Sequence, residues 1–324
     1  MEYLEFVKTV ESKIKERAGE GYTVRVNQVV KNNEVYLDGL VILKEESKIS
    51  PNIYLNGYYE QYLKGKTVEE VVLEIWEIYE ASFHSEVIKE FDLPLDLDSQ
   101  KDKIIFRLVH YERNKERLKG IPHLRFLDLA ITFHCLVSRG ELGVSTLTIT
   151  NIIKQKWKIS LNELMRYAVK NTQQLFPVSI RRMEEVIFDI MQSELISLAG
   201  ESPEEESDSY ACQVHELIQE ILEMKRVPEP YGMYVMSNLS GVNGAASLLY
   251  EEVLQEFACS IQSNLYILPS SIHEIIIIPY SNALNVQQLK SMVKEVNQTQ
   301  VPREDILSDR VYIYSYQEHS FQIM

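Results

Sequence analysis

A strand, a helix and a second strand follow one another between residues 231 and 279, and this pattern constrains the fold more than any other part of the chain. Residues 233–236 and 265–268 are short apolar runs typical of buried strands. Between them, apolar side chains recur with a helical period from residue 245 to about residue 262. Strands joined by such a crossover run parallel. We therefore expect the loops that follow both strands to lie at the same edge of one sheet.

The elements that follow extend this pattern. Residues 275–278 are four consecutive isoleucines, which is typical of a buried strand. A helix is predicted over residues 286–298 and a last strand over residues 311–314. The resulting β-α-β-β-α-β order is the ferredoxin-like order, and it predicts an α/β-type domain over residues 213–324.

Residues 1–200 predict an α+β domain with at least five strands, so the whole chain is predicted to be α+β. Residues 201–212 are rich in acidic side chains and contain a proline, which indicates an exposed linker between the two domains. In the first domain the predicted helices are 2–18, a short one from residue 58 that ends at Gly65, 67–83, 160–175 and 179–198. The predicted strands are 22–30, 35–43, 104–109, 126–137 and 144–149.

Composition excludes several classes of protein. The formal net charge of −15 repels phosphate, so binding of nucleic acid or of an anionic membrane is disfavoured. No apolar run has the length needed to cross a bilayer. The three cysteines are far apart and form no CxxC pair, so neither a zinc site nor a disulfide framework is indicated. Together with an acidic N-terminus that is unlike a secretory signal, this predicts a cytoplasmic protein.

Three segments resemble those of a known family. They are residues 49–56 (ISPNIYLN), 122–130 (PHLRFLDLA) and 268–274 (LPSSIHE). Together they resemble a family of uncharacterised proteins, a domain of unknown function common in Gram-positive gut bacteria. The resemblance covers nearly the whole chain. It implies a soluble bacterial protein whose two halves occur together, and it implies no activity, cofactor or catalytic residue.

The first candidate site lies at the predicted sheet edge. The predicted ligand-binding residues are Asn238, Ser240, Asn243, Gly244 and Ser270, and the predicted catalytic residues are Ser271 and His273. The free amides at Gly244 and the helix start can hold an anion, and a hydroxyl beside an imidazole supplies the parts of a nucleophilic site. The simpler interpretation is a tight turn whose hydroxyls bond the backbone. No G-x-S-x-G motif is present.

The second candidate lies between residues 110 and 134, where several residues of metal-ligand type occur. They are His110, Glu112, His123, Asp128 and His134, together with Arg125. No two histidines stand four residues apart and no H-E-x-x-H is present, so no metal site is predicted. Asp128 lies within an apolar run and needs a partner if it is buried. A structural ion pair is therefore predicted, with Arg125 as its natural partner, although opposite strand faces leave that pairing open.

Two further groups are weaker candidates. His215 and Glu216 lie on a predicted helix over residues 214–224, but a second histidine is missing, so a solvated face is the better interpretation. The tyrosines between residues 54 and 62 could stack on a base or a sugar, dock a partner, or pack against the next helix. No P-loop, dinucleotide or kinase motif is present, so no cofactor is expected.

The absence of a specific catalytic constellation favours a non-catalytic protein that binds a macromolecular partner or a small ligand. The alternative is a hydrolase with Ser271 as nucleophile and His273 as base. The two functions differ in geometry, because the hydrolase requires the Ser271 hydroxyl within hydrogen-bond reach of an imidazole. The identity of the ligand or partner, and the oligomeric state, do not follow from the sequence.

Overall fold

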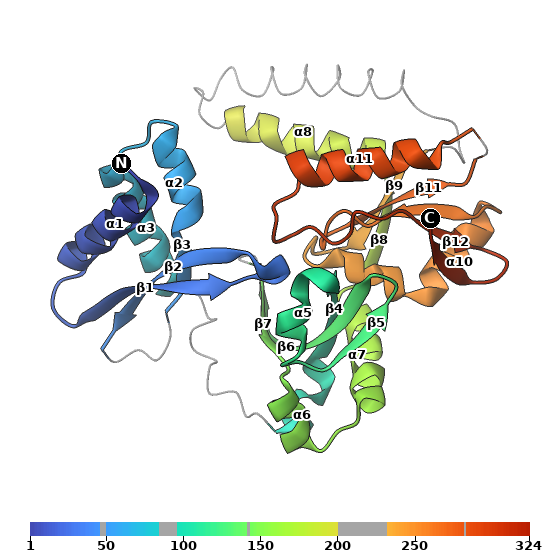
Figure 1. The fold of residues 1–324 in the computed structure, drawn as a ribbon, viewed down its shortest axis with the longest axis horizontal. Coiled ribbons are helices and arrows are strands. Elements are labelled where there is room, and N and C mark those ends of the chain that lie inside the picture. The colour runs from blue at the N-terminus through green and yellow to red at the C-terminus, as the bar shows by residue number, and fades with distance from the viewer. Residues whose placement is uncertain (46–49, 84–95, 141–142, 200–231, 282) are drawn as a thin grey trace. The chain divides into compact units, whose positions relative to one another are not determined.

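The computed structural model describes residues 1–45, 50–83, 96–140, 143–199, 232–281 and 283–324. They form two compact units, residues 1–96 and residues 97–324. Both units combine helices with antiparallel sheets, so the predicted α+β class is confirmed (Figure 1). In the described ranges, no helix has the length and apolar character needed to cross a membrane.

The first unit packs helices against a small antiparallel sheet with the strand order β1-β2-β3. Phe6, Val10 and Ile14 recur every four residues along α1 and are fully buried, so one face of this helix forms the core. The elements of this unit are α1 (Tyr3–Ala18), β1 (Tyr22–Val30), η1 (Asn32–Glu34), β2 (Tyr36–Lys44), β3 (Asn52–Tyr54), α2 (Leu55–Leu63) and α3 (Val68–Phe83).

The second unit begins with an antiparallel sheet in which β6 pairs with β4, β5 and β7. The turn between β5 and β6 consists of Leu127 and Asp128, and Leu127 has a positive φ of 55°. The elements here are α4 (Leu97–Gln100), η3 (Lys101–Lys103), β4 (Ile104–His110), η4 (Glu112–Asn114), α5 (Lys115–Leu118), β5 (His123–Phe126), β6 (Leu129–Gly140), β7 (Gly143–Thr148), α6 (Asn151–Trp157) and α7 (Leu161–Leu175).

A larger antiparallel sheet follows, with the order β13-β12-β10-β11-β9-β8. Strands β9 and β10 both pair antiparallel with β11, which lies between them, so they run in the same direction. Its elements are β8 (Val178–Arg182), α8 (Met183–Ala199), β9 (Tyr234–Asn238), η5 (Gly244–Leu249), α10 (Glu251–Ser260), β10 (Leu265–Leu268), β11 (Ile275–Pro279), α11 (Val286–Thr299), β12 (Tyr312–Ser315) and β13 (Ser320–Ile323).

The two sheets of the second unit share one buried core. Phe106 of the smaller sheet, Met236 of the larger sheet and Leu254 of α10 belong to the same apolar cluster. Helix α11 covers another face of the larger sheet, where Leu289 packs in one cluster with Tyr266 (Figure 1). This packing fixes α11 and the loops around it relative to both sheets.

The predicted division of the chain differs from the observed one. The predicted linker at residues 201–212 lies outside the described residues. The compact units divide at Asp96 and Leu97 rather than near residue 200. The reason is that β8, from the predicted first domain, pairs with β9 in the larger sheet. Residues 178–182 are therefore a strand, and the helix predicted from residue 179 begins at Met183.

The ferredoxin-like arrangement is not confirmed, although the elements from β9 to β12 follow the predicted β-α-β-β-α-β succession. A ferredoxin-like sheet places its first strand beside its fourth. Here β10, the second strand of the succession, lies beside β12, and β8 and β13 extend the sheet at its two ends. Residues 1–200 contain β1 to β8, which agrees with the prediction of at least five strands.

Candidate functional site

The loops after β9 and β10 meet at one edge of the larger sheet, as the sequence predicts. Ser237 Oγ donates a hydrogen bond of 2.7 Å to the carbonyl oxygen of His273. Gly244 lies at this contact, where an added Cβ would stand 2.7 Å from Asn238 N and closer still to the His273 carbonyl oxygen. Only glycine allows the two loops to approach so closely, because a Cβ would meet backbone atoms of both loops and, nearer still, Ser237 Oγ.

The hydroxyl of Ser271 bonds the backbone. Ser271 Oγ accepts a hydrogen bond of 3.0 Å from His273 N, and the residue is buried. Ser270 contributes its carbonyl oxygen, which accepts from Leu307 N at 2.8 Å. Among the described residues no hydrogen bond joins Ser271 Oγ to an imidazole, so the geometry that the hydrolase requires is absent. The simpler interpretation, a turn closed by its own hydroxyl, describes this loop.

His273 joins its own loop to two others. Its Nε2 lies 3.5 Å from Asp305 Oδ1. Its Nδ1 lies 3.3 Å from Asn243 N and 3.2 Å from the carbonyl oxygen of Gly241. The hydrogen bond with Asp305 raises the pKa of His273, against the opposing effect of burial. A neutral ring accepts from Asn243 N at Nδ1, whereas a protonated ring donates from Nδ1 to Gly241.

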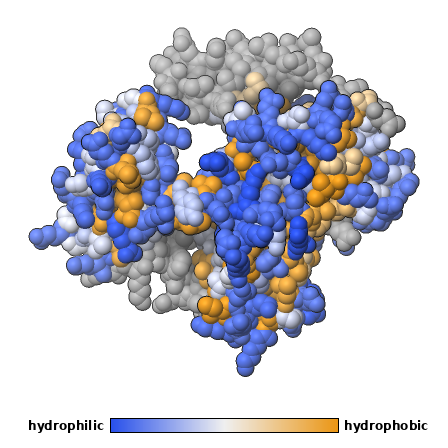
Figure 2. Space-filling view, viewed as in Figure 1, coloured by the Kyte–Doolittle hydropathy of each residue, from blue (hydrophilic) through white to orange (hydrophobic). Residues whose placement is uncertain are grey.

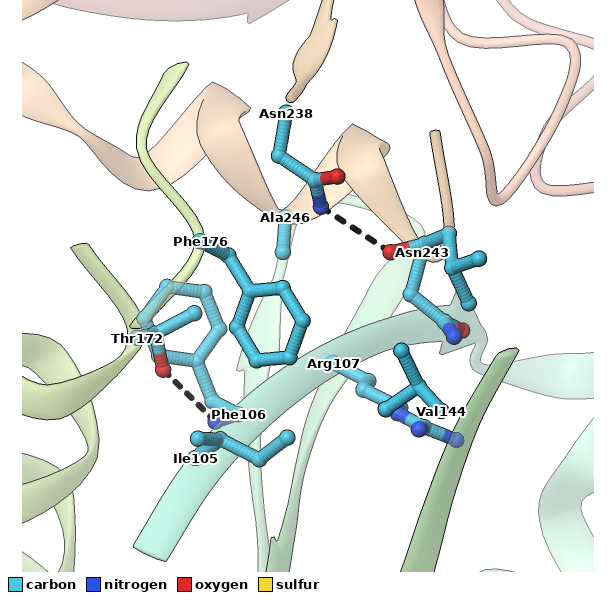
Figure 3. A pocket seen from close by; sticks show the side chains of 10 residues that line it. Ile105, Phe106, Arg107, Val144, Thr172, Phe176, Asn238, Asn243 and Ala246 are labelled. Carbon is cyan, nitrogen blue, oxygen red and sulfur yellow. Dashed lines mark hydrogen bonds between the residues drawn. The ribbon is translucent and has the colours of Figure 1, made fainter. Parts of the chain in front are cut away.

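Asn238 and Ser240 shape the turn after β9. Asn238 Oδ1 accepts from Ser240 N at 3.0 Å, and Asn238 Nδ2 donates to the carbonyl oxygen of Val242 at 2.9 Å (Figure 3). Asn238 and Asn243 also line a small pocket that contacts Phe106 of β4. Its cavity volume is about 10 Å³, space for about one water molecule. This pocket is too small for an organic ligand, and it is lined by two of the predicted binding residues, Asn238 and Asn243.

Asp128 connects its hairpin turn to the C-terminal part of the chain. Its Oδ2 accepts a hydrogen bond of 2.7 Å from Ser308 Oγ, and its Oδ1 accepts a hydrogen bond from the Tyr312 hydroxyl. The pKa of Tyr312 is raised mainly by burial, and in addition by the negative charge of Asp128. His110 Nε2 lies 3.8 Å from Asp128 Oδ2. The carboxylate is therefore half-buried and well bonded, as a buried acid must be.

Arg125 is not the partner of Asp128, so the pairing that the sequence left open does not form. Its guanidinium carbon lies 4.6 Å from the ring centroid of Tyr111, and its Nε donates to the carbonyl oxygen of Leu127 at 3.2 Å. The turn at Leu127 and Asp128 explains the difference. It directs the carboxylate toward Ser308, away from the strand that carries Arg125.

The histidines of this region have separate partners. His110 Nδ1 accepts from Arg113 N at 3.1 Å, and burial, then Arg113, lowers the pKa of His110. The neutral ring therefore carries its proton on Nε2, toward Asp128. His123 Nδ1 lies 3.0 Å from the carbonyl oxygen of Ile121. His134 is buried on β6, and burial holds its pKa well below the usual value. In the part of the chain that the structure describes, no cluster of metal-ligating side chains occurs.

A larger pocket lies beside Asp128, and its walls come from distant parts of the chain. Its volume is about 370 Å³, and sites for small molecules occupy roughly 300–1,000 Å³. Figure 2 shows strongly hydrophilic residues over the surface between α5 and α11. The pocket is lined by His110, Arg113, Asp128, Lys290, Lys294, Asp309 and Arg310.

Positive charge exceeds negative charge in this pocket. Its lining has four Lys or Arg side chains and two carboxylates, a formal net charge of +2 on a chain of −15. Asp309 accepts from Arg113 Nη2 at 2.5 Å and from Asn297 Nδ2 at 2.7 Å. Lys290, Lys294 and Arg310 have no carboxylate within ion-pair distance among the described residues. These three cations therefore remain for a ligand.

The sequence interpretation singled out two of the seven residues that line this pocket. It singled out His110 and Asp128, but it missed the cations on α11 and after it. Lys290 and Lys294 stand four residues apart on a helix that the sequence predicts, so both lie on one face of that helix. This shared face could have indicated a positively charged site. Nothing in the sequence indicated that this face lines a pocket with His110.

Of the two weaker candidates, the structure describes only the tyrosines. Tyr59 and Tyr62 pack on α1, where the ring centroid of each lies 5.3 Å from that of Phe6. The prediction placed this packing on the next helix, but α1 precedes the tyrosines in the chain. His215 and Glu216 lie outside the described residues.

The sequence from residue 3 to residue 316 matches a family described as a family of unknown function, DUF5688. The match covers nearly the whole chain, so the chain belongs to this family. No curated protein and no solved structure matches it.

Proposed function

We propose that this member of the DUF5688 family binds a small dianionic ligand, of the chemical class of sugar phosphates, in the pocket beside Asp128. The observation that carries the proposal is the net charge of +2 in a 370 Å³ pocket on a chain of −15. The net charge of −15 makes the chain as a whole repel anions. A local excess of cations is therefore a selective feature of this pocket.

The cations suit the phosphate group. Ammonium and guanidinium groups are donors only, and hydrogen bonds between charged groups are about twice as strong as neutral ones. Lys290 and Lys294 stand one helical turn apart, so both can reach one ligand. Arg113 is held in place by Asp309, which reduces the entropy lost when it contacts a phosphate oxygen.

The carboxylate in the pocket suits a ligand with hydroxyl groups. An ionised carboxylate has about four acceptor positions. Ser308 and Tyr312 each use one on Asp128. The remaining capacity of Asp128 can accept from a sugar hydroxyl beside the phosphate. A ligand with both groups uses the cations and the acid together, whereas inorganic phosphate uses the cations alone.

The lining supports binding rather than chemistry. It contains no serine, threonine or cysteine that could act as a nucleophile. Ser308, the hydroxyl next to Asp128, is fully buried, donates to Asp128 and accepts from Arg310 N at 2.9 Å. A hydroxyl already bonded on both sides and shielded from the pocket is a poor nucleophile.

Titration calorimetry tests the proposal with a hexose phosphate, the free hexose and inorganic phosphate. We expect the hexose phosphate to bind best and the free hexose not to bind. The double variant Lys290→Gln/Lys294→Gln should lose affinity, on the order of tenfold for each lysine, because each charged hydrogen bond contributes about 1.5 kcal/mol. The control Lys156→Gln/Lys170→Gln changes the charge equally at exposed positions of α6 and α7 and should bind as the wild type does.

Native mass spectrometry of the chain purified from its own host extends the test to ligands outside this panel. The expected result is a retained anionic small molecule that the double variant does not retain. Equal binding by the double variant and the control would show that the pocket is not the site. The absence of any bound anion in both experiments would overturn the proposal.

A further inference from the structure

Arg107 of β4 has a buried donor that bonds nothing in the described part of the chain. Its Nε is inaccessible to solvent and has no hydrogen-bond partner there. Its side chain lines the small pocket beside the loop after β9 (Figure 3). A buried donor without a partner is costly, and a buried charge without a counter-charge costs more. The site is separate from the pocket beside Asp128 and does not depend on the function proposed for it.

No carboxylate of the described residues forms an ion pair with Arg107, and the nearby charges have the same sign. Burial, and then the positive charge of Arg117, lower the pKa of Arg107 to about 10. Burial also lowers the pKa of Arg117, which is itself half-buried. His134 supplies no compensation, because it is neutral and bonded to Thr132 at 3.0 Å. A bound anion would therefore compensate the positive charge of Arg107 and Arg117.

The size of the cavity decides which anion fits. Its volume of about 10 Å³ admits one water-sized particle and excludes phosphate, sulfate and carboxylate ligands. Ile105, Phe106 and Val144 supply apolar walls, which leave a charge poorly solvated. The side-chain amide of Asn243 extends into the same pocket on the side of Arg107 (Figure 3). It is a second potential donor, since no described residue bonds that amide.

We propose that Arg107 and Asn243 bind a single monatomic anion of the halide class, chloride under cellular conditions. A water molecule in this position satisfies the N–H groups but leaves the buried charge uncompensated. A halide ion accepts hydrogen bonds from the N–H groups and also compensates the buried charge. The anion joins β4 to the loop after β9, so it stabilises the packing of the two sheets of the second unit.

Bromide replaces chloride and is located by its anomalous scattering. Crystals of the full chain grown in bromide should show a peak within hydrogen-bond distance of Arg107 Nε. A water molecule at that place, or a carboxylate of the chain bonded to Nε, would overturn the proposal. This measurement uses the wild-type protein, so it does not depend on the folding of any variant.

Thermal unfolding gives a second test in solution. At about 200 mM salt and equal ionic strength, we expect a Tm higher by about 2 °C or more in chloride than in gluconate, because an anion that binds only the folded state stabilises it. Arg107→Met should abolish this difference. The control Arg166→Met, at an exposed position of α7, should keep it. Equal Tm values for the wild type in the two salts would count against the site.

Discussion

His273 and Asp305 form an ion pair between two loops of the second unit, with 3.5 Å between Nε2 and Oδ1. This pair raises the pKa of His273 above its ordinary value of 6.5. A raised pKa in the folded state means that protonation stabilises the fold. The contribution is complete below the pKa of the unfolded chain, about 6.5, and is lost as the pH rises through the higher folded value.

We expect Asp305→Asn to remove this dependence on pH. The variant should be less stable than the wild type at acidic pH, by up to about 1 kcal/mol because the pair is partly exposed. At about pH 9 the two proteins should differ little, since His273 is neutral in both. Urea unfolding of both proteins at several pH values measures the difference. A constant difference across this range would contradict the prediction.

Gly244 should tolerate no side chain. An added Cβ would meet backbone atoms of Asn238 and His273, which cannot move without separating β9 from the loop before β11. We expect Gly244→Ala to lower the free energy of unfolding by about 2–4 kcal/mol, as overpacking against backbone does.

Gly57 provides the matched control for this substitution. It lies within α2, and an added Cβ there would meet nothing within 4 Å. Gly57→Ala should be neutral or stabilise the protein by up to about 1 kcal/mol, because alanine favours the helix. Thermal or urea unfolding measures the free energy of unfolding of both variants. Equal changes in the two variants would show that the contact at Gly244 is not tight.

Asp128 should matter far more to stability than Arg125. Asp128→Ala leaves the hydroxyls of Ser308 and Tyr312 without their acceptor in a buried place. We expect a loss of about 2–4 kcal/mol. Arg125→Ala removes a contact with Tyr111 and one hydrogen bond at the surface, which should cost less than about 1 kcal/mol. Similar losses in the two variants, measured by urea unfolding, would restore Arg125 as the partner of Asp128.

Local patterns in the sequence were sufficient for most elements of the fold. The helical period of residues 286–298 and the isoleucine run at 275–278 predict α11 and β11 almost to the residue. The common edge of β9 and β10 also follows from their crossover connection. Residues 178–182 show the limit of such patterns. They are a strand because β9 lies beside them, and no local signal separates them from the helix that follows.

The candidate pocket shows the same limit. The sequence indicates that Asp128 needs a partner, and the nearest suitable residue along the chain is Arg125. Its actual hydrogen-bond partners include Ser308, which lies 180 residues away. A contact of that kind depends on how two sheets pack, and this packing cannot be predicted from the patterns of a single sequence. The same holds for Lys290 and His110, which only the folded chain brings to one pocket.

The negative charge of Asp309 should limit the affinity of the pocket for a dianion. Asp309 positions Arg113, but it also opposes the ligand. Asp309→Asn keeps an oxygen acceptor and raises the formal net charge of the lining from +2 by one unit. We expect hexose phosphate to bind roughly threefold to tenfold more tightly, since removing one like charge near a surface site gains about 1 kcal/mol.

The control is Asp98→Asn, which changes the charge of the chain equally at an exposed position in α4. Its affinity for hexose phosphate should equal that of the wild type. Titration calorimetry of the three proteins in one buffer measures the effect. Tighter binding by both variants would mean that the net charge of the chain governs affinity, and weaker binding by Asp309→Asn would mean that the position of Arg113 matters more than the charge beside it.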